Sequence, residues 1–218
     1  MMSTSSYPES DEELSEASMD DMQAVVNMCG DVYHGIDYLP STFPHLLHGP
    51  GVKAFVYKVK GELVAFTSTQ LQAGGQYLLF LASRVKVAWQ GHGIYSRFRR
   101  KIFEHFSDKE LYPDLRHETV TVTAGNSHAK GGRMRNAGWH LVMTRHSRMR
   151  GFEASNLHQL RLKKPTHEVT AMVRDEFLQL LQAGSRHWLH LFPQKRIIHS
   201  WKSYVVTEDN LDLILGQS

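Results

Sequence analysis

The chain has little cysteine and no long apolar run. Its 218 residues include a single cysteine, Cys29, which excludes a disulfide framework and a multi-cysteine zinc site. No apolar run approaches the roughly 18 residues that a membrane span needs. The N-terminus lacks the basic-then-apolar layout of a signal peptide, and the fourteen histidines show no metal-binding spacing. We therefore expect a cytoplasmic protein that has no membrane span and no metal site.

Lys and Arg are absent from the first 22 residues, which carry seven acidic groups. The rest of the chain, with 25 basic and 15 acidic residues, has a formal charge of +10. A body this basic predicts an anionic partner, such as nucleic acid, a membrane surface or a phosphate-bearing cofactor. The acidic start, residues 1–11, reads as a disordered tail. We expect one domain over residues 12–152 and an extension over residues 153–218.

Apolar periodicity and turn residues predict alternating helices and strands. Helices are expected at 19–33, 91–106, 129–137 and 168–183, with a short helical piece in the loop that follows residue 33 and a turn or two at the C-terminus. Strands are expected at 52–60, 62–71, 77–88, 117–124 and 197–206, and residues 139–152 are expected to form a strand pair or one long strand. Gly61 between the first two strands indicates a tight antiparallel hairpin. This order is typical of an α/β domain.

The segment that carries chemistry runs from a predicted strand into a predicted helix, over residues 84–95. Gly91 and Gly93 let the backbone fold closely around an anion, with the amides of the first helical turn pointing at it. Six basic residues and no acid lie at positions 84–101: Arg84, Lys86, Arg97, Arg99, Arg100 and Lys101. The pattern has the form of a pyrophosphate cradle. The alternative is an ordinary glycine turn before an exposed basic helix.

This segment resembles the acyl-CoA signature of the GCN5-related N-acetyltransferases: Gln or Arg, two residues, Gly, one residue, then Gly or Ala. Tyr95 stands where that family has a small residue, so its ring would crowd the cofactor or require a shift of the helix. Asn126 and Gly138-Trp139 are similar to the later half of the same fold. The resemblance implies a mixed, mostly antiparallel sheet flanked by helices, with a C-terminal α/β extension. It also implies acetyl-CoA as co-substrate, bound by Val85, Val87, Gln90, Gly91, His92, Gly93, Ile94, Tyr95 and Asn126.

A second segment, VYHGIDYLPS at residues 32–41, is similar to a segment of the histidine N-acetyltransferases and their vertebrate relatives. The resemblance implies transfer of an acetyl group to the amine of a small molecule, for example an amino acid such as histidine. The amine would attack the thioester directly in a ternary complex, accelerated by proximity. Asp37 and Tyr38 could hold the substrate ammonium. Their structural alternative is a capped turn and a packed aromatic ring.

The usual acid and base of that family are replaced in this chain. Our alignment places Leu81 where the relatives carry a glutamate, and Met134 where a tyrosine often protonates the departing thiolate. His128 and Tyr95 are the substitute catalytic candidates, since each can move a proton. A solvated histidine and a packed tyrosine are the alternatives.

Two other functions are consistent with the sequence. The first is a relative that binds acyl-CoA without catalysis. The second is a basic nucleic-acid module formed by residues 84–101 and 130–150, although no nucleic-acid motif is present. We favour the acetyltransferase, with acetyl-CoA and a small-molecule amine as partners and no nucleic acid or membrane.

Overall fold

The computed structural model describes residues 11–30, 37–123, 132–144, 172–182, 190–199 and 202–216. The chain divides into two compact units. The first comprises Met1–Val122 with His199–Val205, and the second comprises Thr123–Ile198 with Val206–Ser218. The first unit contains the central sheet and the glycine-containing segment, so the candidate site lies in it.

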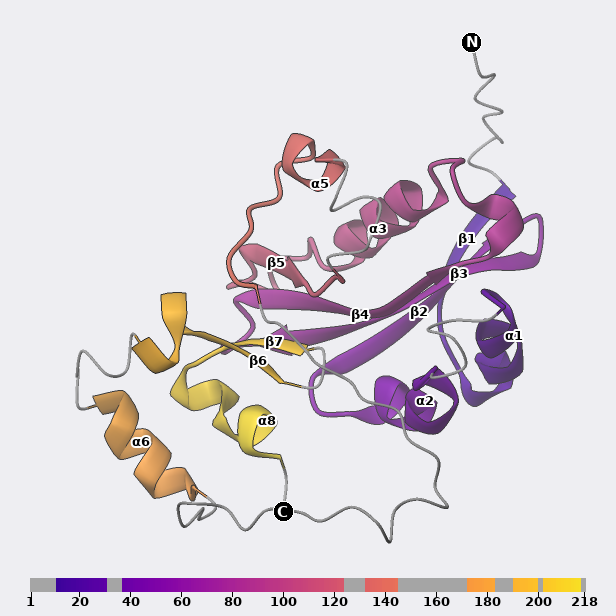
Figure 1. Ribbon diagram of the computed structural model, residues 1–218. Coiled ribbons are helices and arrows are strands. Elements are labelled where there is room, and N and C mark those ends of the chain that lie inside the picture. The colour runs from indigo at the N-terminus through magenta and orange to yellow at the C-terminus, as the bar shows by residue number, and fades with distance from the viewer. Residues whose placement is uncertain are drawn as a thin grey trace, which may run out of the picture. The chain divides into compact units, whose positions relative to one another are not determined.

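The first unit is a mixed α/β fold built on a five-stranded sheet (Figure 1). Its strands, in both chain order and sheet order, are β1 (Glu12–Glu16), β2 (Val52–Val59), β3 (Glu62–Gln72), β4 (Tyr77–Val85) and β5 (His117–Val120). Neighbours pair antiparallel except β4 and β5, which are parallel. The predicted fold class, a mostly antiparallel sheet flanked by helices, is therefore confirmed.

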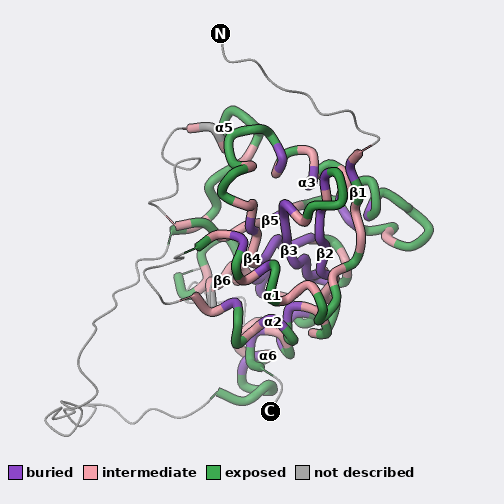
Figure 2. The backbone as a smooth tube through the Cα atoms, turned by 90° about the vertical axis from the view of Figure 1, so that its right-hand side faces the viewer, coloured by how far each residue is buried: buried purple, intermediate pink, exposed green. Residues whose placement is uncertain are grey.

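Helices cover both faces of this sheet, and each face has its own apolar cluster. On one face lie α1 (Met22–Asn27), which follows the 3-10 turn η2 (Met19–Asp21), and α2 (Leu39–His48). On the other face lies α3 (Ile94–His105), whose apolar stripe of Ile94, Phe98 and Ile102 is almost completely buried. The buried backbone in Figure 2 is concentrated in the central strands between these two layers. The sheet is thus held from both sides.

The hairpin predicted at Gly61 is present. Lys60 and Gly61 both have positive φ, at 53° and 77°, as a two-residue turn of the mirror-image type requires. This turn matches the right-handed twist of the two strands it joins, β2 and β3.

Several predicted boundaries are wrong. β1 was not predicted, because its sequence EELSE is polar and becomes a strand only by pairing with β2. The first helix stops at Asn27, soon followed by Gly30 with φ of 64°, and the short helical piece is a full helix, α2. β4 ends at Val85, with a 3-10 turn η4 (Val87–Trp89) after it. Residues 139–144 form no strand, and residues 145–152 lie outside the described residues.

The remaining elements are short. They are α5 (Arg133–Asn136), α6 (Arg174–Gln182), η6 (Pro193–Lys195), β6 (Arg196–His199), β7 (Lys202–Val205), η7 (Glu208–Asn210) and α8 (Leu211–Leu215). The single strand expected at 197–206 is thus two strands. In the second unit, Arg174 pairs with Asp212 at 3.4 Å, and Phe177 packs on Phe192. In the described portion of the chain, no helix has the length and apolarity to cross a membrane, and no group of three metal-binding side chains occurs.

Candidate functional site

Strands β4 and β5 pair over only part of the length of β4. The parallel register runs from Tyr77 opposite His117 to Phe80 opposite Val120, where it ends. β4 continues to Val85, paired there with β3 but not with β5. The part of a strand beyond its last paired residue can present backbone N–H and C=O groups to an extended partner. Residues 81–85 therefore form a half-open edge in the middle of the sheet.

A bulge in β4 lies within this edge. The register places Phe66 opposite Arg84 and Ser68 opposite Leu81, so Ala82 and Ser83 together face Thr67. Ala82 takes a φ of 51°, which an alanine adopts at a cost of about 1 kcal/mol. Bulges redirect side chains and are frequent next to functional sites. Here the bulge turns Ser83 towards α3, while Leu81 faces the opposite cluster.

A glycine turn connects the half-open edge to α3. Gly91 and Gly93 have φ of 80° and 74°, and Gly93 is the left-handed N-cap of the 12-residue helix. A Cβ built on Gly91 would meet nothing within 4 Å, so the space beside the turn is open. The first amides of a helix lack intrahelical acceptors and carry the positive end of its dipole. The turn therefore fits a phosphate or pyrophosphate group.

The basic side chains near this turn are mostly engaged by acids from other parts of the first unit. The ion pairs are Arg84–Asp37, Lys86–Glu62, Arg97–Glu12, Arg99–Glu118 and Arg100–Glu104. Since the paired charges are largely neutralised, anion binding depends on the backbone amides. The second basic stretch of the nucleic-acid alternative, residues 130–150, lies partly outside the described residues.

Arg97 fixes the glycine turn to the sheet. Its Nη1 donates to the His92 carbonyl at 3.1 Å, and its Nε donates to Glu12 Oε1 at 2.8 Å. The Glu12 side chain has no exposed surface, and the Tyr57 hydroxyl donates to its other oxygen. Burial and this contact with Glu12 raise the pKa of Tyr57. A buried carboxylate on β1 therefore anchors the arginine that holds the turn.

The structure places the predicted cofactor-binding residues along the edge and the turn. Val85 is half-buried at the end of β4, and Val87 is 61% exposed. Gln90 is exposed, and its Nε2 donates to the Val85 carbonyl at 3.0 Å. His92 is exposed, whereas the side chain of Ile94 is in the core. Ile94 can thus offer only its backbone, and Asn126 lies outside the described residues.

Tyr95 points into the fold rather than into the glycine turn. Its ring packs against the cluster between α3 and the sheet, and its hydroxyl lies 3.2 Å from Ser83 Oγ. Burial raises the pKa of this phenol above its ordinary value. The side chain therefore reaches Ser83, in the part of β4 that extends beyond its pairing with β5. His128, the other catalytic candidate, lies outside the described residues.

Asp37 and Tyr38 meet Arg84 at the end of the same strand. The Arg84 Nη2 donates to Asp37 Oδ1 at 3.2 Å, and the guanidinium lies over the Tyr38 ring at 5.7 Å. Asp37 Oδ1 also accepts from the Leu39 amide at 3.1 Å, so it caps the first turn of α2. Cys29 Sγ lies 3.5 Å from the Val85 carbonyl beside this pair, and burial raises the pKa of its thiol. Both members of the predicted ammonium site thus have partners within the protein.

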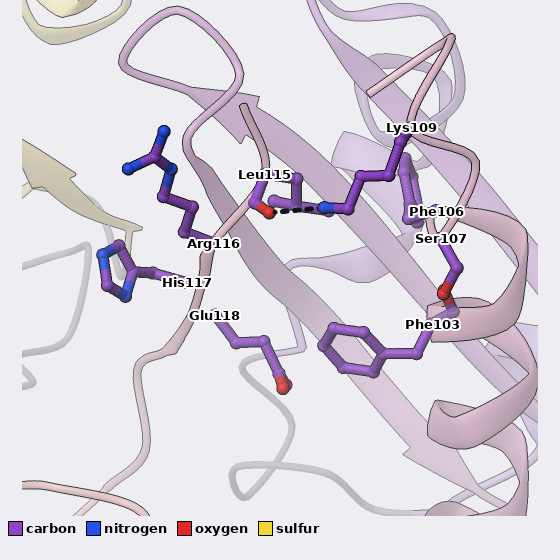
Figure 3. A pocket seen from close by; sticks show the side chains of 8 residues that line it. All are labelled: Phe103, Phe106, Ser107, Lys109, Leu115, Arg116, His117 and Glu118. Carbon is purple, nitrogen blue, oxygen red and sulfur yellow. Dashed lines mark hydrogen bonds between the residues drawn. The ribbon is translucent and has the colours of Figure 1, made fainter. Parts of the chain in front are cut away.

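A separate pocket of about 180 Å³ lies at the far end of α3 (Figure 3). It is lined by Phe103, Phe106, Ser107, Lys109, Leu115, Arg116, His117 and Glu118. The Lys109 ammonium donates to the Leu115 carbonyl across it, at 3.0 Å. Because a 12-residue helix is about 18 Å long, this pocket is well separated from the glycine turn. It is not the predicted cofactor site.

Sequence reasoning missed three residues at the site. Glu12 was counted with the acidic start of the chain, although it is buried. Thr67 and Ser83 were passed over as ordinary strand residues. One signal could have identified Thr67: it begins the polar run Thr67–Gln70 within the otherwise apolar strand β3, and all four of these residues are buried.

No family model matches the chain, and no curated protein matches its sequence. Solved structures are similar to it. A possible acetyltransferase from Clostridium difficile 630 is 17% identical, with a TM-score of 0.49 over 65% of this chain and 99% of that one. The ribosomal-protein-S18-alanine N-acetyltransferase from Escherichia coli is 16% identical, with a TM-score of 0.44 over 57% and 76%. An aminoglycoside acetyltransferase from an uncultured soil metagenomic sample is 10% identical, with a TM-score of 0.48 over 65% and 99%. Since these TM-scores are below 0.5, we base the proposal on the geometry of this chain.

Proposed function

We propose that the protein is an N-acetyltransferase that transfers an acetyl group from acetyl-CoA to the amine of a small molecule. One observation carries the proposal: β4 extends to Val85, past the end of its pairing with β5 at Phe80 and Val120, and the chain then passes through η4 to the glycine turn that starts α3. An extended edge and an anion site are thereby joined in one continuous stretch of chain. Acetyl-CoA has both an amide-containing arm, which fits the extended edge, and a pyrophosphate, which fits the anion site.

The glycine turn would hold the pyrophosphate. Gly91 leaves open space beside the backbone, and Arg97, which lies against Gly93, fixes the turn through the His92 carbonyl. The open side of Gly91 is where a side chain would otherwise lie. Because most nearby basic side chains are already ion-paired, the amides and the helix dipole supply the attraction.

The half-open edge of β4 would hold the acyl arm. Residues 81–85 lie beyond the last residue pair between β4 and β5, and the Val85 carbonyl among them already accepts from Gln90 Nε2. They can pair with the amides of the arm as a further strand would, and one N–H can polarise the thioester carbonyl. A fixed amide dipole stabilises the negative charge that develops on the carbonyl oxygen during attack.

The acceptor would approach from the side of Arg84, Asp37 and Tyr38. Arg84 and Asp37 are mostly buried and paired with each other, so an acceptor with an ammonium and a carboxylate would have to replace this pair with its own contacts. An amino acid such as histidine has this chemistry. The resemblance of residues 32–41 to histidine N-acetyltransferases supports the same class of acceptor.

Thermal unfolding with and without acetyl-CoA is the first test. A ligand at about 100 times its dissociation constant stabilises the folded state by roughly 2.7 kcal/mol, which raises the melting temperature by a few degrees. The Gly91→Glu variant places a carboxylate in the open space of the turn and should abolish the shift. Release of free thiol with histidine and other amines then tests transfer. A wild-type protein that is not stabilised by millimolar acetyl-CoA would contradict the proposal.

Binding without thiol release would instead support the second candidate, a non-catalytic acyl-CoA-binding protein. That candidate is favoured by Leu81, whose buried side chain offers no carboxylate to activate the amine.

A further inference from the structure

Three hydroxyl groups form a chain from β3 through β4 to α3. The Tyr95 hydroxyl lies 3.2 Å from Ser83 Oγ, and Ser83 Oγ lies 2.7 Å from Thr67 Oγ1. Thr67 Oγ1 is in turn 3.1 Å from the Leu81 carbonyl and 3.3 Å from the Ser68 carbonyl. The chain therefore ends at oxygens that can only accept a hydrogen bond.

Hydrogen counting gives two possible directions for this chain, because each hydroxyl has one proton to donate. In one direction Thr67 donates to the Leu81 carbonyl, Ser83 donates to Thr67, and Tyr95 donates to Ser83. In the other direction Thr67 donates to Ser83 and Ser83 donates to Tyr95, which leaves the phenolic proton for a further acceptor.

The chain lies where the proposed reaction would take place. Ser83 belongs to the bulge, beyond the last pair between β4 and β5. Tyr95 is in the first turn of α3, next to the glycine turn. The tyrosine hydroxyl thus reaches the half-open edge from the side that carries the proposed pyrophosphate site.

We propose that Tyr95 transfers the proton from the attacking nitrogen to the departing sulfur, with Ser83 and Thr67 as positioning residues. The proposal rests on the proposed function. The amine nitrogen forms a bond to the thioester carbon, and the carbon–sulfur bond breaks with its electron pair on sulfur. Tyr95 gives its phenolic proton to sulfur and takes a proton from nitrogen. The products are the amide and the free thiol, and the tyrosine ends in its starting form.

Reversal of the hydroxyls makes this exchange possible. When Tyr95 gives up its proton, Ser83 can turn its proton towards the phenolate, and Thr67 can turn its proton towards Ser83. Two short rotations therefore stabilise a charge that burial alone would penalise. Burial raises the pKa of the phenol above its ordinary value, which favours the protonated form with which the reaction begins.

The carboxylates described near this edge already accept hydrogen bonds from arginine side chains. Glu118 accepts two hydrogen bonds from Arg99, at 2.8 and 2.7 Å, and Asp37 is held by Arg84. The sequence contains no acid between Glu62 and Glu104. One hydroxyl that serves both nitrogen and sulfur removes the need for a separate carboxylate base.

The experiment compares Tyr95→Phe with Tyr112→Phe, a control at the opposite end of α3. Both variants should retain the thermal shift with acetyl-CoA. Tyr95→Phe should lower kcat about 100- to 1000-fold, in the range of general acid–base contributions, with KM changed less than threefold. Tyr112→Phe should leave both constants near wild type.

The positioning residues are tested by pairs of variants. Ser83→Ala and Thr67→Val should lower kcat about tenfold and change its dependence on pH, because the phenolate loses its donor. Thr67→Ser and Ser83→Thr keep a hydroxyl and should restore the rate and the pH profile. A purely structural role would lower stability without moving the pH profile.

The outcomes separate the two proposals. Wild-type protein that does not bind acetyl-CoA contradicts the proposed function. Binding and turnover that are unchanged in Tyr95→Phe contradict the proton transfer alone. Binding without thiol release from any amine overturns both the transferase and the proton transfer.

Discussion

Glu12 on β1 and Arg97 on α3 form an ion pair, 85 residues apart in sequence, whose carboxylate is completely buried. The pair joins the edge strand of the sheet to the helix that carries the glycine turn. Removing one partner of a buried pair leaves an uncompensated charge in the interior. This is far more costly than the loss of an exposed pair.

We therefore expect Glu12→Gln to lower the free energy of unfolding by about 3 kcal/mol. It should also weaken acetyl-CoA binding, because Arg97 no longer holds the His92 carbonyl in place. Urea denaturation and the thermal shift with ligand measure the two effects. Glu13→Gln, at the exposed neighbouring position, is the control and should change neither. Equal stability of the two variants would show that the pair contributes nothing.

The same pair shows which parts of the fold the sequence could predict. The β2–β3 hairpin and the apolar face of α3 are local patterns, and both were predicted close to their true positions. β1 was missed because a polar five-residue segment has no local reason to be extended. Glu12 appeared as one of seven acidic residues near the N-terminus, and only pairing with β2 buries it.

The candidate site divides in the same way. The glycine turn was predicted from Gly91 and Gly93, because glycine spacing before a helix is a local signal. The ion pairs that neutralise the basic run join distant segments, as Arg84 does with Asp37. The contact between Tyr95 and Ser83 depends on the bulge in β4 that carries Ser83, which no periodicity predicts. These features of the site could not be predicted from the sequence, because they depend on contacts between distant segments of the chain.

The hairpin turn offers a stabilising substitution. Lys60 occupies a left-handed position directly before Gly61, where asparagine is strongly preferred. Lys60→Asn should raise the free energy of unfolding by about 0.5 to 1 kcal/mol, since the loss of the exposed ion pair with Asp11 costs less. Chemical denaturation measures the change. Lys58→Asn, within β2, is the matched control and should be destabilising; a stability gain in that variant would contradict the turn argument.

Stability should depend on pH through His105. Partial burial lowers the pKa of its imidazole, and the Lys53 ammonium, 3.4 Å away, lowers it further, while Glu16 opposes the shift. A lowered pKa means that the unfolded chain binds the proton more readily than the folded protein. The stabilisation is therefore complete above the unfolded value of about 6.5 and decreases as the pH falls towards the folded value.

We expect His105→Phe to reduce this loss of stability between about pH 7 and pH 5. Phenylalanine keeps an aromatic ring against Phe55 and Phe106 but cannot titrate. Denaturation midpoints across this pH range provide the measurement. Lys53→Met should reduce the dependence in the same direction but less, because burial is the larger cause. Identical pH slopes in the wild type and His105→Phe would exclude His105 as the source.

A substitution of Leu81 tests whether a carboxylate can act at the position where the enzymes that this chain resembles carry a glutamate. Its side chain is 7% exposed and packs in the cluster of α1 and α2, on the face of the sheet opposite Tyr95. Leu81→Glu would bury a charge for which this apolar cluster offers no partner, at a cost of several kcal/mol. We therefore expect the variant to unfold more readily and to gain no transferase activity. Leu81→Met should retain the wild-type stability within about 1.5 kcal/mol. A stable Leu81→Glu protein with increased turnover would mean that the base of this site belongs on β4 and that Tyr95 does not serve the nitrogen.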